Sequence, residues 1–157
     1  MTQAADEAAI TSLLEARAQA VRAKDPEAAL SPCAPDFLCY DLAPPLARAG
    51  AAALDRRGLT AWFDTWRGPI RYDLRNLAIT VSGDIAFGHG LLRIGGTKKD
   101  GYEGDLWTRQ TVCLRRRDGA WQLVHEHVST PFYMDGSLRA AVDLQPGEED
   151  SSASAGR

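Results

Sequence analysis

The sequence lacks most of the features that commit a chain to a membrane, to secretion or to nucleic acid. Its first residues, Met-Thr-Gln-Ala-Ala-Asp-Glu, are polar and acidic, so no signal peptide is readable, and no apolar run reaches the length of a membrane helix. The formal net charge of −3 gives no general attraction for nucleic acid or anionic membranes. We therefore expect a cytoplasmic protein that binds neither nucleic acid nor membrane.

Cysteine is scarce, and its spacing argues against two common kinds of site. Cys33, Cys39 and Cys113 form an odd set without a Cys-x-x-Cys pair, unlike a disulfide framework or a zinc knuckle. Gly88-x-Gly90 lacks the third glycine and the following helix of a dinucleotide-binding fingerprint. The sequence therefore predicts free thiols and no cofactor.

The chain of 157 residues has the size of one domain with a hydrophobic core. We place this domain at residues 1–134 and treat residues 135–157 as a C-terminal extension. From about residue 145 the extension has no apolar side chain larger than alanine, so it cannot offset the entropy of ordering and is expected to be flexible.

The apolar spacing changes once along the chain, from helical to strand-like. A period of three to four predicts helices first, and a period of two predicts strands afterwards. The expected helices are 6–24, 26–30 and 51–66, the last with Gly58 as a weak point where the segment could divide. The expected strands are 37–41, 70–81 with a bulge at Arg75-Asn76, 85–94, 102–115 and 121–128. Helices followed by long antiparallel strands predict the α+β class.

The last strand carries the most titratable groups. Strict alternation would place His125 and His127 on the face of Trp121 and Leu123, with Glu126 on the opposite face. Both faces carry apolar residues, and one core covers only one of them. We therefore expect a homodimer built on the outer face of the sheet.

Several local motifs together resemble a known family. They are Lys24-Asp25, Ala34-Pro35-Asp36, Tyr40-Asp41, Arg48-x-Gly50, Trp66 and the closing Asp-Gly-x-Trp-x-Leu-Val-His-Glu-His-Val-Ser at 118–129. This pattern resembles the SnoaL-like and ketosteroid-isomerase-like branch of the nuclear transport factor two superfamily, over about residues 6–134.

The resemblance implies a cone-shaped, cystatin-like α+β barrel, with a curved antiparallel sheet, helices over its mouth and a deep apolar pocket. It also implies dimerisation through the sheet. The closing motif is also similar to the association domain of calcium/calmodulin-dependent kinase II, which assembles subunits and is not an enzyme. The resemblance therefore predicts the fold more narrowly than the function.

Carried over residue by residue, the resemblance places Asp41 where the isomerases have their general base. At the positions of the two isomerase oxyanion donors, this chain has Arg17 and Thr111. Asp41 ends an apolar strand, so desolvation at the rim of a cavity would raise its pKa toward that of a useful base. The alternative is a turn cap.

Two alternatives remain open for the last strand. If His125 and His127 face the cavity, they are the acid–base groups; if they lie at the outer face, Glu126 is the inward group. A His-x-His pair also occurs in metal sites, but no carboxylate follows four residues later, so we expect no metal.

The neighbouring elements supply further candidates. Arg109 is expected either to hold a carboxylate or enolate or to neutralise Glu126 as a structural ion pair. The candidate substrate-binding residues are Tyr40, Trp62, His89, Trp107, Arg109 and Thr111.

These residues predict a small cofactor-independent enzyme that moves protons on an apolar carbonyl or polyketide-like small molecule, as an isomerase, cyclase or dehydratase. Asp41, His125, His127 and Glu126 are the catalytic candidates. The alternative is a non-catalytic ligand-binding or assembly domain of the same fold.

Overall fold

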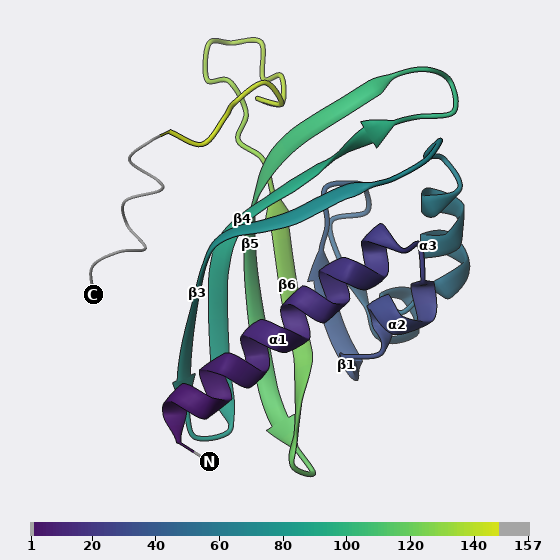
Figure 1. Ribbon diagram of the computed structural model, residues 1–157. Helices are drawn as coiled ribbons and strands as arrows, with labels where there is room; N and C mark the ends of the chain where they lie inside the picture. The colour runs from purple at the N-terminus through teal and green to yellow at the C-terminus, as the bar shows by residue number, and fades with distance from the viewer. Residues whose placement is uncertain (1, 148–157) are drawn as a thin grey trace.

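The structure is a computed structural model, and it describes residues 2–147 (Figure 1). Within these described residues, three α-helices, one short 3-10 helix and six strands follow one another. Their bounds are α1 Gln3–Arg22, α2 Pro26–Leu30, β1 Cys33–Tyr40, β2 Arg48–Ala49, η1 Gly50–Ala52, α3 Arg56–Phe63, β3 Arg71–Ser82, β4 Ile85–Thr97, β5 Glu103–Arg117 and β6 Ala120–Ser129.

Each α-helix begins at a side chain that caps its free N–H groups. The Thr2 hydroxyl accepts a hydrogen bond from the amide of Ala5 at 3.2 Å, and Asp25 accepts one from Ala28 at 3.0 Å. Asp55 caps α3 in the same way. The segment expected to be helical over 51–66 is divided before Asp55 and not at the weak point Gly58, because η1 ends at Ala52 and α3 begins at the Asp55 cap.

The sheet has the strand order β2-β1-β6-β5-β4-β3. Strands β3 to β6 pair antiparallel, as predicted, while β1 pairs parallel with β6, so the sheet is mixed. The sheet curves around α1, which crosses it, and α2 and α3 lie at one end of α1 (Figure 1). We call the side toward α1 the concave face and the opposite side the convex face. This is the α+β architecture expected from the sequence, as an open curved sheet.

The core lies between α1 and the concave face. Its main cluster joins Ile10 and Leu14 of α1 to Val112 and Leu123 of the sheet. A second cluster, around Phe63 and Trp66, lies beneath the C-terminal half of α1. Burying a side chain of this size contributes about 1.5–3 kcal/mol each, so α1 is held mainly by its apolar stripe.

Two irregularities decide which side chains reach the concave face. The pairing of β3 with β4 shifts between Arg75 and Ala78, which confirms the predicted bulge. The pairing of β5 with β6 shifts from Leu114↔Leu123 to Cys113↔His125, so Val124 is an extra residue in β6.

The extra residue reverses the alternation of β6. Trp121 and Leu123 are buried on the concave face, and the next buried residues are Glu126 and Val128. His125 and His127 therefore lie on the convex face. The prediction that the histidines share a face with Trp121 and Leu123 is wrong, because it assumed an unbroken strand.

After β6 the chain forms a short folded segment. Phe132 and Ala140 form an isolated bridge, and the amide of Tyr133 donates to the carbonyl of Arg139 at 2.8 Å. Gln145, at the start of the region expected to be flexible, accepts a hydrogen bond from Trp107 at 3.2 Å. Most of that prediction falls on residues 148–157, outside the described residues.

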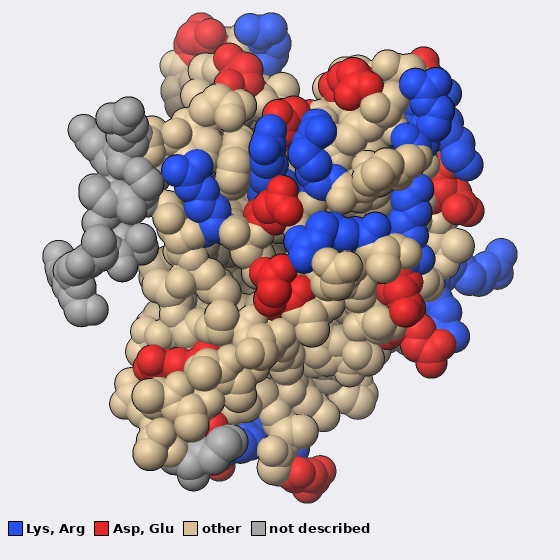
Figure 2. Space-filling view, in the orientation of Figure 1, with Lys and Arg blue, Asp and Glu red and all other residues tan. Residues whose placement is uncertain are grey.

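The surface gives two further observations. No helix within residues 2–147 combines the length and apolar character needed to cross a bilayer. On the side seen in Figure 2, basic and acidic residues are interspersed.

Candidate functional site

A buried ion pair lies on the concave face, between α1 and β6. Nη1 of Arg17 donates to Oε2 of Glu126 in a short contact, and Nε of Arg17 donates to the carbonyl of Ala29 at 3.2 Å. The two side chains retain only 14% and 10% of their exposure. A charge pair this far from water is costly unless it is well paired, so its position is a candidate for function.

Local structure explains why these two residues meet. Arg17 lies three residues after Leu14 on α1, within the apolar stripe that faces the sheet. Glu126 reaches the same side because the bulge at Val124 turns it inward, next to Cys39 of β1. In the sequence, this ion pair is indicated by a charged residue inside each of two apolar patterns, Arg17 in that of α1 and Glu126 in that of β6.

The Glu126 carboxylate and burial shift the pKa of Arg17 in opposite directions. Burial alone would lower the pKa of Arg17, but the neighbouring Glu126 carboxylate more than offsets it, and the pKa lies above its usual value. The guanidinium is therefore a permanent cation. Within residues 2–147 its Nη2 group makes no hydrogen bond, so those donors are available to a ligand.

Tyr72 of β3 and two thiols complete this group. Burial, with a further contribution from Glu126, raises the pKa of Tyr72, so its phenol keeps its proton and is a donor. Burial also raises the pKa values of Cys33 and Cys39, which keeps both thiols neutral. The arrangement offers one cation, one carboxylate and one neutral acid.

Several apolar side chains on the concave side stay partly accessible to solvent. They pack against the main core cluster without being fully buried, and they are Leu13, Ala53, Leu54, Leu74, Leu77 and Ile79, together with Cys33 and Cys39. Leu13 lies one helical turn before Arg17, and Cys39 pairs with Glu126, so the ion pair borders part of this apolar surface.

The histidines predicted as acid–base groups form a separate cluster on the convex face. The ring of Tyr40 makes edge contacts with His125 and His127, with centroids 4.8 and 5.4 Å apart. Nδ1 of His125 lies 2.9 Å from the carbonyl oxygen of Leu38. None of these three side chains faces the ion pair.

The candidates on β4 and β5 also point to the convex face. Thr111 pairs with His127 on one side and with His89 on the other, so these side chains form a row across the sheet. Arg109 is exposed and does not pair with Glu126, so its expected ion pair is wrong. The sequence left open which face lines the pocket; on β5, Thr108 and Gln110 are the buried residues that point inward.

The contacts of Trp107 and Trp62 indicate a structural role for both side chains. The Trp107 ring lies under Arg75 and Arg93, 5.7 and 5.8 Å from its centroid. Trp62 packs against Phe63 and Trp66 in the second core cluster. Neither ring lies beside the ion pair in the described contacts.

Asp41 lies at the exposed end of β1. Its carboxylate accepts a hydrogen bond from the amide of Leu42 at 2.7 Å and lies 3.7 Å from Arg48. The side chain is 51% exposed, so the desolvation predicted for it is wrong. This geometry is that of a turn cap at the rim of the sheet.

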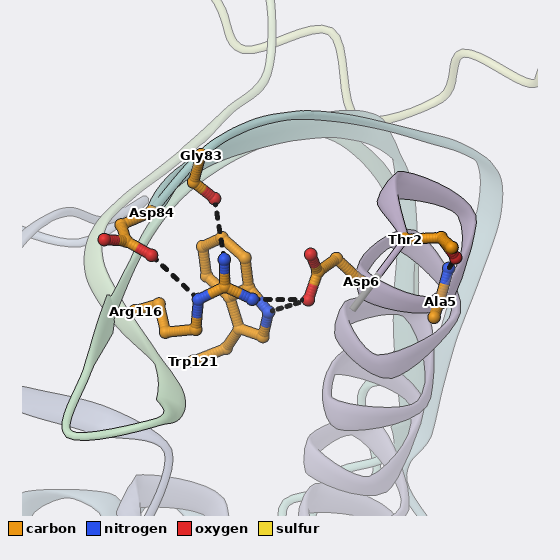
Figure 3. Close-up of polar contacts among 7 residues, drawn as sticks. All are labelled: Thr2, Ala5, Asp6, Gly83, Asp84, Arg116 and Trp121. Carbon is orange, nitrogen blue, oxygen red and sulfur yellow. Dashed lines mark hydrogen bonds and ion pairs between the residues drawn. The ribbon is translucent and has the colours of Figure 1, made fainter.

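Sequence reasoning missed a second polar cluster, at the N-terminus of α1 (Figure 3). Buried Asp6 accepts hydrogen bonds from Nη1 of Arg116 at 2.7 Å and Nε1 of Trp121 at 3.1 Å. Arg116 also donates to Asp84 at 2.8 Å and to the carbonyl of Gly83. This cluster ties α1 to the two hairpins, so the tryptophan of the closing motif is a structural anchor.

The described residues offer no metal centre. In residues 2–147, no group of three or more His, Cys, Asp and Glu side chains is placed to hold a metal ion.

Comparison with known families agrees with the resemblance found in the sequence. The model of the SnoaL-like domain matches residues 10–133. The chain belongs to the SnoaL-like family. A comparison with curated proteins found no match.

Solved structures support the same assignment. An NTF2-like protein of unknown function from Pseudomonas putida KT2440 is 31% identical, with a TM-score of 0.81, over 93% of this chain and 100% of that one. A protein from Novosphingobium aromaticivorans, provisionally described as an aromatic ring hydroxylase, is 26% identical, with a TM-score of 0.72, over 91% and 98%.

A more distant structure shares the fold alone. The association domain of calcium/calmodulin-dependent kinase II from C. elegans is 18% identical, with a TM-score of 0.64, over 82% of this SnoaL-like chain and 98% of that domain. The fold therefore occurs in proteins with different kinds of role.

Proposed function

We propose that this SnoaL-like protein is a cofactor-independent enzyme that moves a proton on an apolar carbonyl or polyketide-like molecule at the concave face. One observation carries the proposal: a buried Arg17–Glu126 pair lies beside the partly accessible side chains of Leu13, Cys33 and Cys39. The apolar surface would bind the body of the substrate, and its carbonyl would point to the ion pair.

Each polar group has a role that its surroundings favour. Arg17 is a buried cation with free donors, so it would stabilise the negative charge that develops on an enolate oxygen. The neutral phenol of Tyr72 would donate to the same oxygen. Glu126 would take the proton from the carbon next to the carbonyl and return it at another position.

Asp41 is a second candidate base. Its position at the end of β1 is where the isomerases that the sequence resembles carry theirs. Its exposure and its contact with Arg48 argue for a weaker role than that of Glu126. Substituting Glu126 and Asp41 one at a time shows which carboxylate is the base.

Proton exchange at carbon is the direct test. Small conjugated ketones and β-keto esters are screened by thermal shift, and the stabilising compounds are followed by NMR in D₂O. Glu126→Gln should slow exchange by about 10²–10⁴-fold, the usual contribution of a positioned acid or base. His127→Gln, on the convex face, is the matched control and should exchange at the wild-type rate.

Two results would count against this assignment. Exchange that is unchanged in Glu126→Gln would remove Glu126 as the proton carrier. Exchange that is lost in His127→Gln would place the reaction on the convex face instead.

The alternative is a domain that binds a ligand or assembles subunits without turnover. The exposed apolar side chains of Ile85, Phe87 and Tyr40 on the convex face favour assembly, and the kinase association domain with this fold is named for that role. We propose that the chain forms a homodimer through the convex face, whether or not it is an enzyme.

Sedimentation at micromolar concentration should give about twice the chain mass of 17.0 kDa. A species that keeps the mass of one chain would contradict the homodimer.

A further inference from the structure

The C-terminal segment, residues 131–147, is an ordered structure that exposes its apolar side chains. We call it the arm. Five of its large apolar residues are exposed: Phe132, Met134, Leu138, Val142 and Leu144. Met134 and Leu138 are 86% and 62% exposed. Single exposed apolar residues are ordinary, but five within 13 positions mark a contact surface.

Internal hydrogen bonds hold the arm in shape. The amide of Ala141 donates to the carbonyl of Pro131 at 2.7 Å, and Asp135 accepts a hydrogen bond from the amide of Ser137 at 3.0 Å. Ala141 itself is buried. The arm is thus shaped before it meets a partner, which lowers the entropy cost of binding.

The position of the arm links it to the convex face. It follows β6 directly, and Gln145 accepts a hydrogen bond from Trp107, whose ring lies on the convex face. The arm therefore stands at the Trp107 end of the convex face, whereas exposed Ile85 and Phe87 lie toward the opposite end, near the β5–β6 hairpin. Two convex faces that pack with their strands in opposite directions would bring each arm to Ile85 and Phe87 of the other copy.

Charge favours contact between an arm and a convex face. Arg109 and Arg115 are exposed on the convex face, and neither has a carboxylate within ion-pair distance in residues 2–147. Two such faces placed against each other would bring these arginines together. The arm carries Asp135 and Asp143 against the single Arg139, and the sequence continues with three acidic residues, 148–150.

We propose that the arm of each chain docks on the convex face of a second copy. Apolar arm residues cover Ile85 and Phe87 of the partner copy, and the acidic residues of the arm lie near its Arg109 and Arg115. This inference rests on the proposed homodimer and adds how that dimer is closed. Around a two-fold axis, both arm contacts form at once.

Two double variants at exposed positions test the arm and the convex face separately. M134E/L138E places charges on the arm, and I85E/F87E places them on the convex face. All four side chains are exposed, so both variants should keep the wild-type circular dichroism and unfolding midpoint. Each should weaken the dimer by at least about tenfold in Kd, measured by sedimentation equilibrium. L46E is the matched control, because Leu46 is 96% exposed in a loop outside both surfaces, and it should not change Kd.

Mixing the two variants tests exchange directly. The arm of I85E/F87E is intact, and so is the convex face of M134E/L138E, so a mixed dimer regains one of the two contacts while each variant alone has none. Native mass spectrometry, which resolves the variants by mass, should therefore show a mixed dimer at concentrations where each variant alone is monomeric.

The possible outcomes distinguish this inference from the homodimer on which it rests. A dimer that resists M134E/L138E but not I85E/F87E, with no mixed species, means that the faces pair directly, and it overturns the arm contact alone. If the wild-type chain is monomeric at the highest concentration tested, and also after 50-fold dilution from it, both the arm contact and the homodimer are overturned. Neither result bears on proton exchange at the concave face.

Discussion

Replacing Arg17 by methionine tests how much the buried ion pair depends on its cation. Methionine keeps most of the length of the side chain but removes the charge, so Glu126 is left buried without its partner. Breaking a buried pair in this way costs about 3–5 kcal/mol. The contact of Arg17 with the Ala29 carbonyl is lost as well, at about 0.5–1.5 kcal/mol.

The structure places the expected loss at the lower end of that range. The 14% and 10% residual exposure lets water reach the uncompensated carboxylate, so we expect a fall in unfolding free energy of about 3 kcal/mol. At about 2–4 °C per kcal/mol for a chain of this size, the midpoint falls by about 6–12 °C. Glu126→Gln should cost less, because its amide oxygen still accepts from Arg17.

Urea unfolding followed by tryptophan fluorescence measures this loss, with circular dichroism as a second probe of two-state behaviour. Arg56→Met is the matched control: Arg56 and Glu27 are 62% and 77% exposed, and a surface pair contributes about 0–1 kcal/mol. The double variant R17M/E126M should recover to within about 1 kcal/mol of wild type, since it removes both charges. A loss below about 0.5 kcal/mol in Arg17→Met would refute the burial argument.

Three further predictions concern other parts of the chain. Burial raises the pKa of Tyr72 above the 10.0 of an exposed phenol, so the unfolded chain loses this proton first as pH rises. The free energy of unfolding should therefore fall as pH rises above 10. Urea titrations at pH 8 and pH 11 measure this fall, and the part due to Tyr72 should be absent in Tyr72→Phe. Deleting residues from Gly147 onward should change the unfolding free energy by no more than about 0.5 kcal/mol, and a loss of several kcal/mol would show that the tail docks. Asp41→Asn should reduce turnover by about 10²–10⁴-fold if Asp41 is the base and leave it nearly unchanged if it is a turn cap, as the exposed side chain favours; comparing kcat with Glu126→Gln separates the two carboxylates.

Local chemistry in the sequence determined the elements and the fold class. Asp25-Pro26 begins a helix because the carboxylate caps the free amides and proline fits the first helical position. Asp118-Gly119 turns the last hairpin with φ angles of 51° and 79°, which glycine adopts without strain and aspartate tolerates. These signals act over a few residues, so they can be read without the rest of the molecule.

The tertiary structure alone decided which face of the sheet each candidate occupies. Alternation along a strand separates its two faces but does not say which one a helix will cover. The bulge at Val124 has no glycine or proline to announce it, and it reverses every later side chain of β6. Arg17 and Glu126 are 109 residues apart, so only the packing of α1 onto β6 brings the cation to the carboxylate.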